Sequence, residues 1–202
     1  MSSDTIEDWY SENLVCPVDK TALAFDGKAL VSSAGRRYPI VDGVPVMLVE
    51  GEQQTMSIAH ASIERAKGHS EVIDQKQALL NLLAERRTGV DPVVAVILRA
   101  TNGIAYSHLV GSSGLTGYPI PEIGLTSKTG ETLLDIGCSW GRWCLSAAQR
   151  GFKPVGIDPS LAAVMAARRI ARKLGLDTRY VVGDARFLPF AEGSFDVVHS
   201  YS

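Results

Sequence analysis

The stretch LLDIGCSWGRW, residues 133–143, decides the fold class of this chain. Its apolar run ends on Asp135 and is followed by Gly137 and Gly141, so a buried strand would enter a glycine turn and then a helix. This succession is the first unit of an α/β sheet. Ligands of such sheets bind beyond the carboxyl ends of the strands, where this loop would lie. The stretch therefore predicts both a fold and the place of a ligand site.

The alternation of strand and helix continues after this loop. Ser160 is placed to cap a second helix, and Gly151 and Gly175 are placed to end the first and second helices. Strands are expected over 132–136, 154–157, 180–182 and 195–199, and helices over 142–149 and from 160 to about 174. The sequence therefore predicts an α/β fold, a Rossmann-like doubly wound parallel sheet with helices on both faces, of which the chain contains the first four strands.

Two further carboxylates follow the next two predicted strands. Asp158, which precedes Pro159, can accept hydrogen bonds from both hydroxyls of a ribose. Asp184 can accept from an adenine amino group, while the backbone N–H of Ala185 binds a ring nitrogen. Glycine at 137 and 141 lets a ligand approach the backbone. The three motifs together suit a nucleoside ligand.

Residues 131–202 resemble the class I methyltransferases. The loop resembles their acidic-x-Gly-x-Gly-x-Gly signature, with Ser139 in place of the middle glycine. The resemblance implies S-adenosyl-L-methionine as cofactor, with Asp158 at the ribose and Asp184 at the adenine. Asp135 would orient the loop or meet the methionine amino group. The implied cofactor-binding residues are Asp135, Gly137, Cys138, Ser139, Trp140, Gly141, Asp158, Pro159, Asp184 and Ala185.

The sequence says less about the catalytic base and the methyl acceptor than about the cofactor. Methyl transfer needs a base only when the acceptor must lose a proton, and His199, near the end of the fourth strand, is the candidate. Its alternative role is packing. The segment after the strand lacks the Asp/Asn-Pro-Pro-aromatic motif of enzymes that methylate adenine or glutamine, which favours a small-molecule acceptor. An NAD(P)-dependent dehydrogenase fits less well, because the loop departs from Gly-x-Gly-x-x-Gly.

Residues 12–50 form a separate, β-rich segment by composition. Strands are expected over 14–18, 29–32 and 44–48, with a turn at 41–43. The motif YPIVDGVPV after Cys16 resembles the small zinc-ribbon-like domain that activates some methyltransferases. The positions that would complete a metal site are Asp19, Val31 and Ala34, so no zinc is predicted and Cys16 is expected to be buried. The domain would act as an activator, as a docking surface for a protein partner, or only as structure.

Residues 51–127 are predicted to form a helical linker. Apolar residues recur at helical spacing over 73–83. The pair Asp91-Pro92 is typical of a helix start, and Asn102-Gly103 of a helix end. Residues 111–121 are rich in Gly, Ser and Pro, which predicts a loop. The methyltransferase domain is expected over 128–202.

Composition limits the other possibilities. The 202 residues carry a formal net charge of −2, so no global basic field attracts nucleic acid or membrane. No apolar run is long enough for a membrane span, and the N-terminus lacks a signal peptide. Three cysteines are typical of a reducing, cytoplasmic setting. Because the chain ends after the fourth strand, we expect a fragment that lacks the acceptor-binding part.

Overall fold

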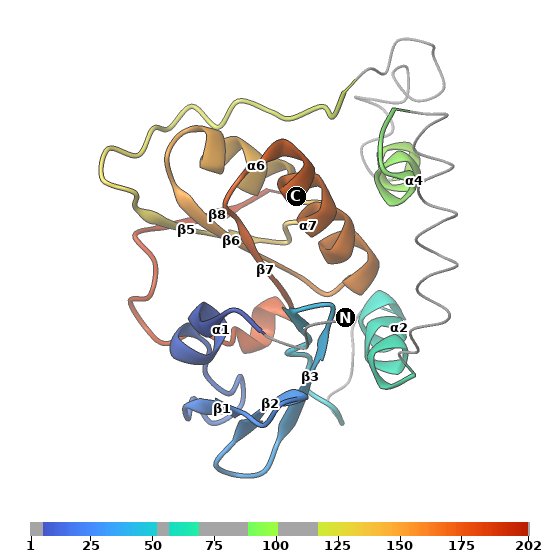
Figure 1. Ribbon diagram of the computed structural model, residues 1–202, viewed down its shortest axis with the longest axis vertical. Helices are drawn as coiled ribbons and strands as arrows, with labels where there is room; N and C mark the ends of the chain where they lie inside the picture. Colours follow the sequence, from blue (N-terminus) through green and yellow to red (C-terminus); the bar gives the residue numbers. More distant parts are fainter. Residues whose placement is uncertain (1–5, 52–56, 69–88, 101–116, 202) are drawn as a thin grey trace.

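The computed structural model of the chain describes residues 6–51, 57–68, 89–100 and 117–201 (Figure 1). A parallel sheet with two helices forms the C-terminal part, and an antiparallel sheet forms the N-terminal part. Two further helices, α2 (Ser57–Lys67) and α4 (Pro92–Ala100), lie along one side of the molecule. The N-terminal module is defined here as residues 6–49.

Four strands build the parallel sheet, in the order β7-β6-β5-β8. The third and fourth strands therefore lie on opposite sides of the first two, and the winding reverses between β5 and β8, which is a topological switch point. The four predicted strands are confirmed, and the last begins two positions later than expected. Their bounds are β5 Thr132–Ile136, β6 Lys153–Asp158, β7 Arg179–Val182 and β8 Val197–Ser200.

The helices α6, Arg142–Gln149, and α7, Leu161–Leu174, begin and end where the sequence predicts. The Ser160 hydroxyl accepts a hydrogen bond from the Ala163 amide at 3.2 Å, and Gly175 ends α7 with φ 65°. Each of these signals acts within a few residues, so the local sequence is sufficient to predict where the helices begin and end.

Both helices pack on the same face of the sheet, which corrects the expectation of helices on both faces. Leu145 of α6 and Val164 of α7 share one buried cluster with Tyr180 and Val182 of β7. Two successive right-handed crossovers in one direction place their helices on one side. Among the described residues, the opposite face is covered instead by the N-terminal module (Figure 1).

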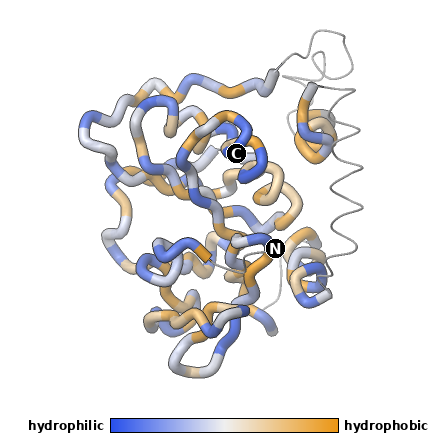
Figure 2. The backbone as a smooth tube through the Cα atoms, in the orientation of Figure 1, coloured by the Kyte–Doolittle hydropathy of each residue, from blue (hydrophilic) through white to orange (hydrophobic). Residues whose placement is uncertain are grey.

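The N-terminal module packs against that opposite face through a second buried cluster. Tyr10, Leu14 and Met47 of the module share it with Ile157 of β6 and Val181 of β7. Hydrophobic segments of the chain meet at this junction (Figure 2). The module therefore takes the position on the sheet that a layer of helices would otherwise fill.

The module itself consists of one helix and an antiparallel sheet in the order β1-β2-β3-β4. Asp42 and Gly43 form the predicted turn, with φ of 47° and 75°. Residues 14–18 are not a strand, which corrects the prediction, because Leu14 and Val15 make only isolated bridges, to Phe190 and Ala22. The bounds are α1 Asp8–Asn13, β1 Leu23–Phe25, β2 Ala29–Ser32, β3 Arg37–Val41 and β4 Val44–Pro45.

Backbone hydrogen bonds join the module to the edge strand β7. The Met47 amide donates to the Val182 carbonyl at 2.6 Å, beside a parallel bridge between Val46 and Val182. The Tyr10 hydroxyl donates to the Tyr180 carbonyl at 3.1 Å and accepts from the Tyr180 amide at 3.2 Å. The predicted strand over 44–48 is therefore shorter than expected, since its second half pairs with β7 and protects that edge.

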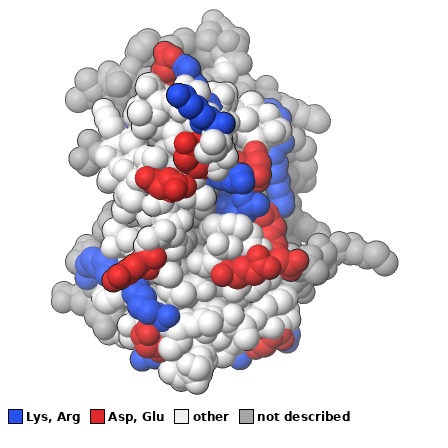
Figure 3. Space-filling model, turned by 90° about the vertical axis from the view of Figure 1, so that its left-hand side faces the viewer, with Lys and Arg blue, Asp and Glu red and all other residues white. Residues whose placement is uncertain are grey.

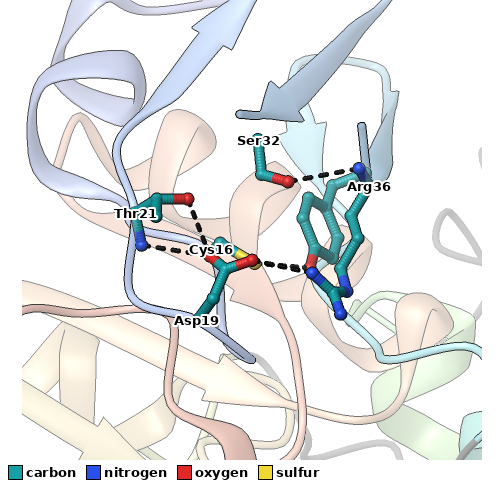
Figure 4. A network of polar contacts seen from close by, with 6 residues as sticks. Cys16, Asp19, Thr21, Ser32 and Arg36 are labelled. Atoms are coloured by element: carbon teal, nitrogen blue, oxygen red, sulfur yellow. Dashed lines mark hydrogen bonds and ion pairs between the residues drawn. The ribbon is translucent and has the colours of Figure 1, made fainter. Parts of the chain in front are cut away.

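The positions that a zinc-ribbon-like domain would use for metal are filled by other contacts (Figure 4). Cys16 is fully buried, and its sulfur lies 3.2 Å from the Tyr38 hydroxyl. The Asp19 carboxylate accepts from the Thr21 hydroxyl and from the Arg36 guanidinium, each at 2.7 Å. Over the described ranges, no group of three or more His, Cys, Asp or Glu side chains is placed to hold a metal ion. These residues do not fit a zinc ion, since a guanidinium already neutralises the carboxylate.

The helices α2, Ser57–Lys67, and α4, Pro92–Ala100, pack against α7. Asp91 caps α4, as predicted, because its carboxylate accepts from the Val93 amide at 2.9 Å and also from Arg169 of α7 at 2.9 Å. The predictions for 73–83 and for Asn102-Gly103 lie outside the described residues, and that for 111–121 lies partly outside. In the part of the chain that the structure describes, no helix has the length and apolarity to cross a membrane.

Candidate functional site

Every second residue of the loop between β5 and α6 has a positive φ. Gly137, Ser139 and Gly141 have φ of 75°, 50° and 77°. The amides of Gly137 and Cys138 both donate to the Ile157 carbonyl, at 2.9 and 3.0 Å. The loop is therefore fastened to the carboxyl end of β6, at the edge of the sheet where ligands bind. Ser139 occupies a conformation that favours glycine, which explains the glycine of the family signature at this position.

The two glycines of this loop have different surroundings. A Cβ atom at Gly137 would meet nothing within 4 Å. A Cβ atom at Gly141 would lie 2.6 Å from the Tyr180 hydroxyl and 2.9 Å from Cβ of Ala167. Gly137 thus leaves open space for a ligand, whereas Gly141 lets the loop pack against α7 and β7. The sequence could not separate these two roles.

Asp158, at the end of β6, links the loop to α7. One oxygen of its carboxylate accepts from the Ser139 amide at 2.9 Å, and the other accepts from the Ser160 amide at 2.8 Å. Burial raises the pKa of this carboxyl above its usual range, and the two amide hydrogen bonds oppose that rise. Each oxygen has two lone pairs, so the carboxylate keeps capacity for further donors such as hydroxyls.

Asp135 lies at the floor of the site rather than on its surface. It is 1% exposed, and its carboxylate lies 2.8 Å from Nδ1 of His199 and 3.5 Å from the Cys144 thiol. Burial raises the pKa of Asp135, and the hydrogen bond with His199 counteracts this. The sequence analysis expected Asp135 to orient the loop or to meet a methionine amino group. The structure places it in contact with the imidazole, which the sequence had not paired with it.

The other predicted residues of the loop are directed into the core. Cys138 is 2% exposed and Trp140 is 1% exposed, and the indole of Trp140 lies 6.0 Å from the ring of Tyr118. Burial raises the pKa of the Cys138 thiol well above its usual value, and that of Cys144 to about 11. The two thiols are therefore poorly suited as nucleophiles. The side chains of Cys138 and Trp140 instead anchor the loop in the core.

Asp184 lies after β7 and begins the short helix η1, Ala185–Phe187. Its carboxylate accepts from the Arg186 amide at 2.9 Å and from the Arg186 guanidinium at 2.5 Å. The hydrogen bonds with Arg186 lower the pKa of Asp184. Ala185 is exposed beside it. The predicted adenine contact of Asp184 would therefore be shared with Arg186, a partner two positions away that the sequence analysis missed.

Ser62 of α2 also contributes to this end of the sheet, and the sequence analysis missed it. Its hydroxyl donates to the Pro159 carbonyl at 2.7 Å and accepts from the Leu161 amide at 2.9 Å. Ala59 and Ala66 are buried on the same helix. The spacing of these three small residues marks the helix face that packs closely, which was the available signal.

An aromatic group borders the imidazole at the switch point. The ring of Trp143, on α6, lies 5.0 Å from the ring of His199 and 5.5 Å from that of Tyr201. The guanidinium of Arg142 lies 5.1 Å from the centre of the Tyr201 ring. These rings, the imidazole and the guanidinium lie together, although they come from two segments of the chain.

The charged side chains of the visible face do not gather by sign. Acidic and basic groups are interspersed in Figure 3. Elsewhere on the surface, exposed ion pairs also join charges of opposite sign, among them Arg36 with Asp19 at 2.7 Å and Lys67 with Glu50 at 3.1 Å. Neighbouring charges of opposite sign cancel at a distance, so this face has no strong field of its own.

The segment that carries the site is similar in sequence to known methyltransferases. Residues 133–202 match the sequence model of a family described as a methyltransferase domain. Norajmaline N-methyltransferase of Rauvolfia serpentina is 41% identical over 75 residues, which are 36% of this chain and 26% of that enzyme. An uncharacterized methyltransferase of Synechocystis is 35% identical over 83 residues, which are 41% of this chain and 37% of that protein.

Among solved structures, that of YcgJ from Bacillus subtilis matches 36% of this chain and 32% of its own length, with 28% identity and a TM-score of 0.35. Residues 133–202 are therefore similar to a methyltransferase domain, both in the family model and in the two methyltransferases. The matched segment spans 26% and 37% of the length of the two curated relatives.

Proposed function

We propose that this chain carries the cofactor-binding part of an S-adenosylmethionine-dependent methyltransferase. The observation that carries the proposal is Asp158, whose carboxylate holds the Ser139 amide of the glycine loop at 2.9 Å at the carboxyl edge of the sheet. The loop and this carboxylate both fall inside the segment that matches the methyltransferase model. A nucleoside ligand is expected at this edge.

The residues at this edge fit the cofactor in chemistry and in space. Gly137 has no neighbour where a Cβ would be, so a ligand can approach its backbone. Asp158 retains lone pairs for the ribose hydroxyls, and Asp184 with Ala185 would hold the adenine. When bound, S-adenosylmethionine supplies an activated methyl group on a sulfonium. The protein then needs mainly to bind, orient and exclude water.

The N-terminal module would support this site rather than act apart from it. It pairs with β7 at Val182, immediately before the adenine motif at Gly183-Asp184. We propose that it acts through this contact as an intramolecular support of the adenine end of the site. A protein partner that docks on residues 12–50 stays a prediction, as does a small-molecule acceptor.

Binding of the cofactor to the full chain tests the proposal. Isothermal titration with S-adenosylmethionine should give saturable binding, and Asp158→Asn should weaken it about 10- to 100-fold, because charge-assisted hydrogen bonds are lost. Asp177→Asn is the matched control, since that carboxylate is 78% exposed in a loop beyond α7. Thermal unfolding of each variant checks that the fold is retained. No saturable binding to the folded wild-type chain, or equal binding by Asp158→Asn, refutes the proposal.

A further inference from the structure

His199 and Asp135 face one another across the switch point of the sheet. They occupy paired positions in the parallel strands β8 and β5, and Nδ1 of His199 lies 2.8 Å from a carboxylate oxygen of Asp135. Paired residues of neighbouring strands point to the same face of a sheet. That face is the one covered by α6, whose Cys144 thiol also contacts Asp135.

This contact selects one form of the imidazole. An ionised carboxylate only accepts hydrogen bonds, so Nδ1 carries the hydrogen and Nε2 keeps its lone pair. Among the residues that the structure describes, no hydrogen-bond partner of Nε2 is found. The Asp135 side chain is 1% exposed and that of His199 is 21% exposed, so the carboxylate is buried while the imidazole keeps contact with the surface. A buried carboxylate of this kind fixes the tautomer and the orientation of a general base.

The surroundings of the imidazole favour a particular kind of acceptor. The indole of Trp143 is 5.0 Å away from it, and Tyr201 extends the aromatic surface. The charged and titratable groups around His199 are Asp135 of β5, Arg142 and Cys144 of α6, and Tyr201 after β8. Flat aromatic faces favour a planar ligand, and the guanidinium disfavours a cationic one.

We propose that His199 is the general base of methyl transfer, oriented by Asp135, and that the acceptor is a planar hydroxyl compound of the phenol or enol type. The proposal rests on the proposed function of the same site. A neutral amine attacks with its own lone pair and needs no base, whereas a hydroxyl must lose its proton to become an effective nucleophile. A base built in this way therefore suits an acceptor that must lose a proton, such as a hydroxyl.

The step is balanced in atoms and electrons. Nε2 of His199 takes the hydroxyl proton while the acceptor oxygen forms its bond to the methyl carbon. This bond replaces the carbon–sulfur bond, whose electron pair remains on sulfur, so the sulfonium becomes a neutral thioether. His199 then returns the proton to solvent.

The tautomer can be measured without any turnover. In the full chain labelled with ¹⁵N-histidine, long-range proton–nitrogen spectra should show His199 as the Nδ1–H form at neutral pH. Asp135→Asn should convert it to the Nε2–H form, because the amide can donate to Nδ1. An Nε2–H tautomer in the wild type overturns the proposal, and so does a tautomer that Asp135→Asn leaves unchanged.

The role in catalysis is tested with phenols of graded acidity. His199→Gln should lower the rate about 10²- to 10⁴-fold for a weakly acidic phenol, and the loss should shrink for phenols that are already ionised at the assay pH. The control is Ser200→Ala, because Ser200 is an exposed neighbour of His199 on the same strand. This variant should keep the wild-type rate for each phenol of the series.

The outcomes separate this proposal from the one on which it rests. If the wild type binds no S-adenosylmethionine, the proposed function fails. If it binds the cofactor and methylates amines but not phenols, or methylates no phenol of the series, the acceptor class assigned here is overturned. A loss in His199→Gln that is equal for all phenols means that the histidine is structural, and it overturns the role as base.

Discussion

The backbone amide of Ser139 donates a hydrogen bond of 2.9 Å to the carboxylate of Asp158, and it does so from a left-handed conformation with φ 50°. The bond joins the loop after β5 to the end of β6. A side chain at this φ is strained, because Cβ approaches the following carbonyl oxygen. Ser139 therefore makes the hydrogen bond to Asp158, but its strained backbone lowers the stability of the fold.

Replacement of Ser139 by glycine should relieve this strain. We expect Ser139→Gly to raise the free energy of unfolding by up to about 1 kcal/mol, since about 1–2 kcal/mol of strain is partly offset by the greater freedom of glycine in the unfolded chain. Urea unfolding measures the change. Ser139→Ala keeps the strain and should be close to neutral, so an equal gain from both substitutions would contradict this explanation.

Substitution of the two glycines by alanine should have unequal effects. At Gly141 a Cβ would lie 2.6 Å from the Tyr180 hydroxyl and 2.9 Å from Cβ of Ala167, so Gly141→Ala adds overlap to backbone strain. It should cost about 2–4 kcal/mol or prevent folding, whereas Gly137→Ala should cost only about 1–2 kcal/mol. Thermal unfolding compares the two variants. Equal destabilisation would show that no specific packing exists at Gly141.

Loss of the Tyr10 hydroxyl should loosen the junction between the N-terminal module and β7. This hydroxyl bonds to both the carbonyl and the amide of Tyr180, at 3.1 and 3.2 Å, and burial raises the pKa of Tyr10 to about 12. Tyr10→Phe leaves two buried backbone groups without this partner and should cost about 1–3 kcal/mol. Hydrogen exchange at the Tyr180 amide should accelerate more than at Leu134, in the neighbouring core. Unchanged exchange at Tyr180 would refute this role.

Acid should weaken the N-terminal module through Asp19. Hydrogen bonds from Thr21 and Cys16 lower the pKa of this carboxyl from 3.8 to about 2. Because the pKa is lower in the folded state, the stabilisation is complete above pH 4 and is lost as the pH falls from about 4 to about 2. Unfolding midpoints across this range should fall more steeply for the wild type than for Asp19→Asn. Parallel curves for the two proteins would contradict the assignment.

Local signals in the sequence predicted most of the C-terminal fold. The bounds of α7 agree with the prediction because Ser160 and Gly175 act through a hydrogen bond and a backbone conformation within one turn. The glycine loop was also predicted from a local signal, because glycine adopts a positive φ such as that of Gly137 without help from distant residues. The failure over residues 14–18 has the opposite cause, because Leu14 pairs with Phe190, far away in the chain.

The candidate site was predicted only as a set of positions. The sequence identified Asp135, Asp158 and Asp184 at strand ends, but their partners depend on contacts that no local pattern contains. Asp135 meets His199 only because β5 and β8 are neighbours in a particular register. Likewise, Gly137 and Gly141 differ in role only because Tyr180 packs against Gly141 and not against Gly137.

The sequence by itself determined the order of strands and helices, the glycine loop and the carboxylates that follow the strands, because periodicity, caps and turns act over a few residues. Only the tertiary structure decided which face of the sheet the N-terminal module covers and which histidine forms a hydrogen bond with Asp135. Those features arise from the packing of segments far apart in the chain, and a one-residue change of strand register would remove them.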